Sequence, residues 1–290
     1  MEKVQVFVMT RNRPKMVIKS VNSILSQTYP NIEIVVSDNS TDDETSAILQ
    51  PYISKRLIKY IKQIPMSGIE HLNTIHKIAS SRYYMIFHDD DEMCESMVEN
   101  LYKIIGNKVD IAAVGCNAYK VINGVLKKKL YSQITNNVTF DNMADISRQY
   151  LSYNIVPFPS YMYNRDLVLG AQLNPSVGGK YSDASFIISL INYGKIYWLS
   201  MPLMKYYFHP SQDSYTFDSK QYLSLLNFYK KCGITKKELQ AHRILTIYNY
   251  NIERNKFYGY PYKMSKMLLF YHFSFVYGFK YMLRFIKEMV

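Results

Sequence analysis

Cysteine is scarce in this sequence. The 290 residues include three cysteines, Cys94, Cys116 and Cys232, which lie far apart and show no metal-type spacing. A disulfide framework or a zinc site needs cysteines at short, repeated intervals. We therefore expect reduced thiols in a cytoplasmic protein. The first residues open directly into a strand pattern and lack the long apolar core of a signal peptide.

Long apolar runs are lacking as well. The uncharged stretch Met267–Phe279 has only 13 residues, whereas a helix needs roughly 20 to span a bilayer. Residues 263–288 combine aromatic side chains with lysine and arginine, and a helix of this composition can lie in a membrane interface. We expect this tail to contact an anionic membrane surface. The alternatives are packing on the preceding domain or a contact in a homo-oligomer.

Acidic residues are outnumbered. The chain has 35 Lys and Arg against 23 Asp and Glu, a net charge of +12 and a pI near 9.3. This excess predicts attraction to an anionic partner, which could be a nucleotide, a nucleic acid or an acidic lipid. The length allows one large domain, or a domain of about 200 residues with an accessory segment.

Three of the few acidic residues stand together. Asp89, Asp90 and Asp91 follow the run Tyr83–Phe87, whose aromatic and β-branched residues predict a buried strand. Like charges at a strand end cost energy unless a cation lies beside them. Carboxylates are hard oxygen ligands, suited to magnesium or manganese and not to zinc. The tripeptide therefore predicts a divalent ion that holds a diphosphate, with a solvated acidic turn as the alternative.

The first hundred residues alternate between strand and helix patterns. Strands are predicted at 4–9, 32–36, 57–64 and 83–88, and helices after Pro14, after a capping box at Thr41–Glu44 and over 69–81. Short connections between such elements predict a parallel sheet with flanking helices, which binds ligands beyond the carboxyl ends of its strands. Thr10, Asp38 and the three aspartates all lie at those ends, so we expect one shared site.

The later part of the chain continues with mixed elements. The predictions are strand in 110–140 with a basic turn at Lys127–Lys129, a rigid loop at Pro157–Pro159, helices at 181–193, 219–231 and 235–250, and extended segments at 196–199 and 203–208. The fold class is therefore α/β. We divide the chain into a catalytic domain, 1–215, and a helical C-terminal extension, 216–290.

Five segments in chain order carry a family resemblance. They are Val6–Pro14, Ser23–Asp42, Tyr84–Glu92, Tyr181–Phe186 and Pro202–His209. None is decisive alone, but together they make residues 4–214 similar to the inverting glycosyltransferases of family 2. The resemblance implies the GT-A fold, a Rossmann-like, mostly parallel sheet with flanking helices.

The resemblance also implies a nucleotide pocket. Thr10 and Asn12 match positions that hold the base, and Asp38 matches an aspartate that accepts a hydrogen bond from uracil. Asn73 matches an asparagine that lines the pocket. Arg11 stands where the family usually has an aromatic residue and could bring charge to base or phosphate. Leu72 replaces a frequent arginine, which leaves details of donor binding open.

The same resemblance assigns the chemistry. Asp91 matches the ligand that bridges a metal ion to the diphosphate, Asp89 or Asp90 would lie near the ribose, and Asp89 also belongs to the metal motif. Asp183 matches the catalytic base, although Ser182 stands where an acidic residue commonly precedes it. His209 matches a histidine that approaches the metal or the diphosphate.

Each of these residues also has a simpler interpretation. Asp38 could cap a turn, Asp183 could cap a helix, and His209 could lie in a loop. Thr10 and Asn12 could be helix-entry residues. Arg11, Arg13 and Lys127–Lys129 are interpreted as mostly solvated charge.

The resemblance implies a reaction and its partners. A UDP-sugar donor, with Mn²⁺ or Mg²⁺ as cofactor, would pass its sugar to the hydroxyl of a lipid-linked saccharide, and Asp183 would accept the proton. Inversion would convert an α-linked donor into a β-glycoside. We expect a role in surface polysaccharide assembly, such as O-antigen or capsule, with no nucleic-acid partner. The expected location is the cytoplasm, peripherally on the inner face of the cytoplasmic membrane.

Two other functions fit part of the pattern. A sugar-1-phosphate nucleotidyltransferase has a related sheet but places a glycine-rich loop after the first strand, where this chain has Thr10–Pro14 without glycine. A non-catalytic module could bind nucleic acid or anionic membrane through basic charge. The triple aspartate argues against that module.

Overall fold

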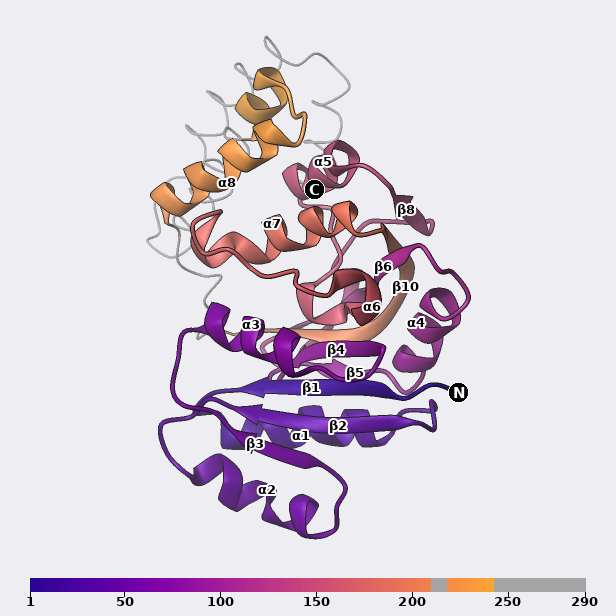
Figure 1. Cartoon of the computed structure of the whole chain (residues 1–290), viewed down its shortest axis with the longest axis vertical. Coiled ribbons are helices and arrows are strands. Elements are labelled where there is room, and N and C mark those ends of the chain that lie inside the picture. The colour runs from indigo at the N-terminus through magenta and orange to yellow at the C-terminus, as the bar shows by residue number, and fades with distance from the viewer. Residues whose placement is uncertain (210–217, 243–290) are drawn as a thin grey trace. The chain divides into compact units, whose positions relative to one another are not determined.

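The computed structural model describes residues 1–209 and 218–242 of the chain (Figure 1). The chain forms two compact units, Met1–Phe228 and Tyr229–Val290. In the second unit, the described part contains a helical segment from residue 236, which follows a cap in which the Glu238 N–H donates to Thr235 Oγ1 at 3.3 Å. The functional division at residue 215 stays a prediction, and the tail expected at a membrane lies outside the described residues.

The described elements alternate along the chain. The strands are β1 (Val4–Thr10), β2 (Ile32–Asp38), β3 (Lys59–Lys62), β4 (Tyr83–His88), β5 (Glu92–Met93), β6 (Ile111–Ile122), β7 (Val125–Leu130), β8 (Val138–Phe140), β9 (Met162–Asn164) and β10 (Lys195–Phe208). The α-helices are α1 (Pro14–Leu25), α2 (Glu44–Ser54), α3 (Gly68–Ile78), α4 (Met97–Ile105), α5 (Met143–Leu151), α6 (Arg165–Val168), α7 (Ser182–Ser189) and α8 (Ser219–Lys231). Short 3₁₀ turns are η1 (Phe158–Ser160), η2 (Gly179–Tyr181) and η3 (Leu190–Asn192).

One sheet organises the first unit. Its strand order is β3-β2-β1-β4-β9-β6-β10-β5, with β7 added to β6 and β8 to β10. The block β3-β2-β1-β4 is parallel throughout, β6 and β10 are also parallel, and β9 runs antiparallel between the two blocks. The predicted Rossmann-like sheet with flanking helices is confirmed.

Helices cover both faces of the parallel block (Figure 1). On one face, Val17 and Val21 of α1 pack with Val6 of β1 in the main apolar core. On the other face, His71 and Ile75 of α3 are buried against the sheet. Side chains of a strand alternate between faces, so β1 is buried on both sides, as its apolar run Val6–Met9 predicts.

The capping box predicted at Thr41–Glu44 is wrong. Thr41 does not begin a capping box: its N–H donates to Asn12 Oδ1 at 2.9 Å, and α2 begins at Glu44 after Asp43, without a side-chain cap. A capping box occurs instead on α3, at Ser67 and Glu70.

The basic turn predicted at Lys127–Lys129 is also wrong, because these residues belong to strand β7. The turn that joins β6 and β7 is Asn123-Gly124, with φ angles of +52° and +75°. Asn-Gly is the preferred pair for a tight hairpin of this kind.

Two further segments are more regular than predicted. The two extended segments at 196–199 and 203–208 form the single strand β10, whose register against β6 shifts around Pro202. The loop expected at Pro157–Pro159 contains the 3₁₀ turn η1, and the helix expected at 181–193 is α7 between η2 and η3. No helix in the described ranges has the length and apolar character that crossing a bilayer requires.

Candidate active site

The carboxyl ends of β1, β2 and β4 meet at one edge of the sheet. Thr10 pairs with Asp38 in the β1–β2 register, and Met9 pairs with His88 in the β1–β4 register. The triple aspartate follows His88 directly. The convergence predicted from the strand pattern is therefore present.

The loop after β1 is tied to the loop after β2. Asn12 adopts a left-handed backbone conformation with φ +54°, which asparagine tolerates better than most residues. Its N–H donates to Ser40 Oγ at 2.7 Å, and its side-chain oxygen accepts the Thr41 N–H. The exposed Arg11 donates to the carbonyl of Met66 at 3.0 Å. Asn12 therefore joins the two loops through both its backbone and its side chain, and a contact of either residue with a base stays a prediction.

Asp38 is fully buried at the end of β2. Its carboxylate accepts the Ser40 N–H at 2.8 Å and the Tyr60 hydroxyl at 2.5 Å, and Lys62 Nζ lies 3.5 Å away. Burial, together with the hydrogen bond to Asp38, raises the pKa of Tyr60, which keeps this hydroxyl a donor. The interpretation of Asp38 as a turn cap is thus partly realised, and its hydrogen bond to uracil stays a prediction.

Asn73 of α3 connects two distant segments. Its amide nitrogen donates to the carbonyl of Leu173 at 2.9 Å, and its oxygen accepts the Leu173 N–H at 2.8 Å. This paired contact positions the chain that leads to α7. A nucleotide contact by Asn73 stays a prediction.

Thr10 and Arg13 bind the first aspartate of the triplet. Thr10 Oγ1 donates to Asp89 Oδ2 at 2.6 Å, and Arg13 Nη1 lies 3.2 Å from Asp89 Oδ1 and 3.1 Å from Asp90 Oδ2. Burial raises the pKa of Asp89 to about 6, although both partners act to lower it. The interpretation of Arg13 as solvated charge is wrong, because its guanidinium bridges the buried carboxylate of Asp89 and the half-buried carboxylate of Asp90.

Asp90 and Asp91 are held from the end of β10. His209 Nε2 lies 2.8 Å from Asp90 Oδ2, and the Tyr207 N–H donates to Asp91 Oδ1 at 2.9 Å. Burial favours the neutral form of Asp90, but His88, His209 and Arg13 hold its pKa below the usual value. The sequence alone did not identify this use of the Tyr207 backbone.

Asp91 has the features of a cation ligand. It is 1% exposed, and its Oδ2 has no hydrogen-bond partner within the described ranges. Burial and the neighbouring Asp90 raise the pKa of Asp91 well above its usual value. A buried, unpaired carboxylate oxygen is costly. A divalent cation at this position would satisfy it.

The grouping of possible ligands differs from the sequence prediction. His88, Asp90 and Asp91 each offer one ligand atom, and these three atoms all lie within 4.8 Å of one another. Asp89 is occupied by Thr10 and Arg13, so its role as a metal ligand stays a prediction, as does that of His209. The donor set of two carboxylates and an imidazole fits a divalent ion.

Asp183 lies in the first turn of α7 and is partly exposed. Its Oδ1 accepts the Ala184 N–H at 2.8 Å. Desolvation raises the pKa of Asp183 to about 6 despite this hydrogen bond. The carboxylate is therefore ionised near neutral pH yet more basic than an ordinary aspartate.

The charges of Asp183 and Asp91 act on the same two tyrosines. The pKa of Tyr131 and that of Tyr206 are raised first by burial and further by the charges of both aspartates. The two rings contact each other, with centroids 4.9 Å apart. The structure therefore brings the candidate base and the candidate ion ligand near one aromatic pair.

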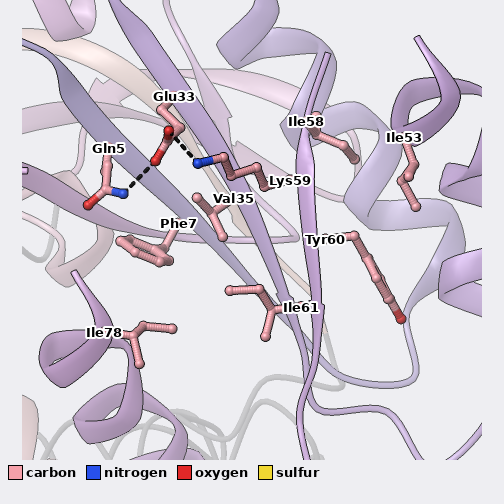
Figure 2. Close-up of a pocket in the computed structure, with 10 residues that line it drawn as sticks. All are labelled: Gln5, Phe7, Glu33, Val35, Ile53, Ile58, Lys59, Tyr60, Ile61 and Ile78. Carbon is pink, nitrogen blue, oxygen red and sulfur yellow. Dashed lines mark hydrogen bonds and ion pairs between the residues drawn. The ribbon is translucent and has the colours of Figure 1, made fainter. Parts of the chain in front are cut away.

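A separate hollow is lined by residues of β1, β2 and β3 (Figure 2), and neither Asp91 nor Asp183 is among its lining residues. Its volume is about 500 Å³, and Phe7, Val35 and Ile61 line it. The carboxylate of Glu33 in this hollow accepts a hydrogen bond from Gln5 at 2.5 Å and pairs with the Lys59 ammonium at 2.7 Å. Although burial opposes the change, these contacts lower the pKa of Glu33 to about 2. We assign no catalytic group to this hollow.

Three comparisons with known proteins bear on this site. Residues 5–167 match the sequence profile described as Glycosyl transferase family 2. The O-antigen biosynthesis protein RfbC of Myxococcus xanthus is 32% identical over 117 residues, which cover 39% of this chain and 9% of that protein. The Escherichia coli protein named UDP-Glc:alpha-D-GlcNAc-diphosphoundecaprenol beta-1,3-glucosyltransferase WfaP is 31% identical over 100 residues, 34% of this chain and 40% of that protein.

A solved structure shares the fold. S. aureus TarS 1–349, in complex with UDP-GlcNAc, aligns with a TM-score of 0.62 at 18% identity and covers 88% of this chain and 73% of that one. In contrast, the matches to RfbC and WfaP cover less than half the length of each of those proteins. The family profile covers more than half of the 290 residues. The chain therefore belongs to glycosyl transferase family 2.

Proposed function

We propose that this glycosyltransferase is a metal-dependent, inverting enzyme that moves a sugar from a UDP-sugar to a hydroxyl of a lipid-linked saccharide. One observation carries the proposal: the buried, unpaired oxygen of Asp91 and the basic carboxylate of Asp183 lie near the same pair of tyrosines. Group transfer with inversion needs such a pair, one group for the departing diphosphate and one for the incoming alcohol.

The residues around Asp91 would bind a divalent ion and the donor diphosphate. Asp91, Asp90 and His88 supply the ligand atoms, and Mn²⁺ or Mg²⁺ bound there would stabilise the negative charge of the leaving group. Arg13 lies against Asp89 and Asp90 at the same edge and contributes a fixed positive charge. Thr10 orients Asp89.

Asp183 would act as the general base. Its carboxylate takes the proton of the acceptor hydroxyl while the oxygen of that hydroxyl forms a bond to the anomeric carbon of the donor. The bond from that carbon to the diphosphate oxygen breaks, and the nucleoside diphosphate leaves with the electron pair. A positioned base contributes roughly 10²–10⁴ to the rate. In-line attack inverts the anomeric carbon, so an α-linked donor gives a β-glycoside.

The names of similar proteins support the donor and the acceptor. WfaP is named for a UDP-glucose donor, a diphosphoundecaprenol-linked acceptor and a β-1,3 linkage, and RfbC is named for O-antigen biosynthesis. TarS has been solved with UDP-GlcNAc. We extend these properties to this chain and place it on the cytoplasmic face of the membrane, where a net charge of +12 favours anionic lipid.

The competing functions have less support. The family assignment and the absence of glycine from Thr10–Pro14 both argue against a nucleotidyltransferase. A non-catalytic basic module has no use for a buried, unpaired carboxylate oxygen, which costs stability unless a ligand satisfies it.

Calorimetry with UDP tests the donor site. We expect UDP to bind with Mn²⁺ present and to bind much more weakly after chelation. Asp91→Asn should abolish the effect of the metal, whereas Asp141→Asn, which changes an exposed aspartate in a loop, should preserve it. Equal UDP binding with and without metal would contradict the metal dependence.

Product analysis tests the transfer. A panel of UDP-sugars with undecaprenyl-diphosphate-linked saccharides should identify a donor, and Asp183→Asn should lower kcat by at least about 10²-fold. The anomeric proton coupling of the product, measured by NMR, should show a β-linkage from an α-donor. An α-linked product would refute inversion.

A further inference from the structure

The ligand group around Asp91 contains a nitrogen donor that the Asp89–Asp91 motif does not supply. We propose that His88 binds the divalent ion directly and that its nitrogen makes the site prefer Mn²⁺ or Co²⁺ over Mg²⁺. This inference rests on the proposed metal-dependent function and names a residue that sets the choice of ion.

The backbone holds His88 in a fixed place. It is the last residue of β4 and pairs with Met9 of the central strand β1. Its carbonyl accepts a hydrogen bond from Ser20 Oγ at 3.1 Å. Its ring lies 6.2 Å from the ring of Phe158, centroid to centroid. The imidazole is therefore presented to the aspartates by the rigid part of the sheet.

The spacing of the three ligands suits an ion. Their atoms lie within 4.8 Å of one another, and two ligands on opposite sides of an ion can be about 4.2 Å apart, twice the usual bond length of about 2.1 Å. Within residues 1–209 and 218–242, no hydrogen bond joins the His88 ring to Asp90 or Asp91. The groups are close enough to share an ion after a shift of about half an ångström, and they are not bonded to each other.

The second sign of a ligand is independent of this spacing. Asp91 Oδ2 is buried without a partner in the described part of the chain. Asp90 is held by Arg13 and His209, and Asp91 by the Tyr207 N–H. The ring nitrogens of His88 make no hydrogen bond within the described residues, so they are available as ligands for a metal ion.

An imidazole nitrogen discriminates between ions. Mg²⁺ prefers an all-oxygen shell and loses water reluctantly. First-row transition ions accept nitrogen more readily, and their affinity for such sites rises from Mn²⁺ to Co²⁺. The contribution of His88 to affinity should therefore increase in the order Mg²⁺, Mn²⁺, Co²⁺.

Metal titrations of the full chain with saturating UDP test this order. His88→Gln should weaken Mn²⁺ binding by about tenfold or more, since even outer-shell changes at metal sites typically cost 10–100-fold. Mg²⁺ binding should change by less than about threefold, and Co²⁺ binding should fall most. His76→Gln is the matched control: this buried histidine of α3 bonds to Tyr84, and its replacement should leave the ratio of Mn²⁺ to Mg²⁺ affinity unchanged.

Pulsed paramagnetic resonance of the Mn²⁺–UDP complex tests direct contact. With ¹⁵N-labelled histidine, we expect a nitrogen coupling in the native protein and in His209→Gln, and none in His88→Gln. A coupling that disappears in His209→Gln but persists in His88→Gln would overturn the proposal. So would an equal loss of Mg²⁺, Mn²⁺ and Co²⁺ affinity in His88→Gln, which would indicate a contact with the diphosphate.

The metal-dependent function and the role of His88 can be refuted separately. If neither Mn²⁺ nor Mg²⁺ binds to the native protein with UDP, both the metal-dependent function and this inference are wrong. If Mn²⁺ binds tightly without a histidine coupling, the function stands and only the role of His88 is refuted. Thermal unfolding of each variant without metal shows whether its fold is retained.

Discussion

Replacing the candidate base should stabilise the protein while it removes activity. Burial raises the pKa of Asp183 from 3.8 to about 6, which corresponds to a cost of about 3 kcal/mol to the ionised form. Partial exposure reduces this figure, and an aspartate in the first turn of a helix recovers about 0.5 kcal/mol. We therefore expect Asp183→Asn to raise the free energy of unfolding by about 1–2 kcal/mol at pH 8.

The pH dependence follows from the sign of this shift. Between about pH 4 and 6 the native Asp183 carboxyl holds its proton more tightly than the unfolded one, so the contribution of Asp183 to stability falls as pH rises through this window. Asparagine does not titrate. The advantage of Asp183→Asn should therefore be complete above about pH 6 and absent below about pH 4.

Urea unfolding at pH 4 and pH 8 measures both values. The single tryptophan, Trp198, is fully buried and hydrogen-bonded to Tyr161, so its fluorescence reports the first unit. Asp141→Asn is the control and should change stability by less than about 0.5 kcal/mol at either pH. An unchanged or lower stability of Asp183→Asn at pH 8 would refute the reasoning, as would a gain of the same size at pH 4.

Three other expected outcomes follow from the same edge of the sheet. Arg13→Ala should cost about 2 kcal/mol of unfolding free energy in urea titrations without metal, because it removes the cation from the buried Asp89 and the half-buried Asp90 and leaves them Thr10 and His209 as partners. Arg148→Ala, which breaks an exposed ion pair, should cost under about 0.5 kcal/mol, and equal losses in the two variants would contradict this. Mn²⁺ with UDP should raise the Tm of the native protein but not that of Asp91→Asn, and chelation should reverse the rise. Tyr60→Phe should cost about 1–2 kcal/mol in the same urea assay, since it removes a donor from the buried Asp38 carboxylate; an unchanged midpoint would show that solvent replaces the hydroxyl.

The sequence predicted the parallel block and its site edge well. Apolar runs that end in polar residues place Thr10, Asp38 and the aspartates at strand ends, and parallel pairing then forces those ends together. The same rule needs no knowledge of side-chain contacts. This is why the location of the site was predictable and the partner of each carboxylate was not.

Contacts between distant segments account for what was missed. Arg13 and Asp89 are 76 residues apart, and Tyr207 and Asp91 are 116 apart, so no local pattern pairs them. Arg13 resembled any solvated arginine in a loop. The wrong capping box at Thr41 has the same cause, because Asn12 from another loop accepts the Thr41 N–H that the Glu44 side chain would accept in a capping box.

The length of β10 has a consequence for engineering this enzyme. Its carboxyl end supplies the Tyr207 N–H and leads to His209, while its middle contains the register shifts around Pro202. Deleting one residue there would slide the strand end by about 3.3 Å and turn every later side chain to the opposite face. Exchanges of β10 segments between relatives should therefore keep the residue count between Leu199 and Met204, or the carboxylates lose their supports while the rest of the fold survives.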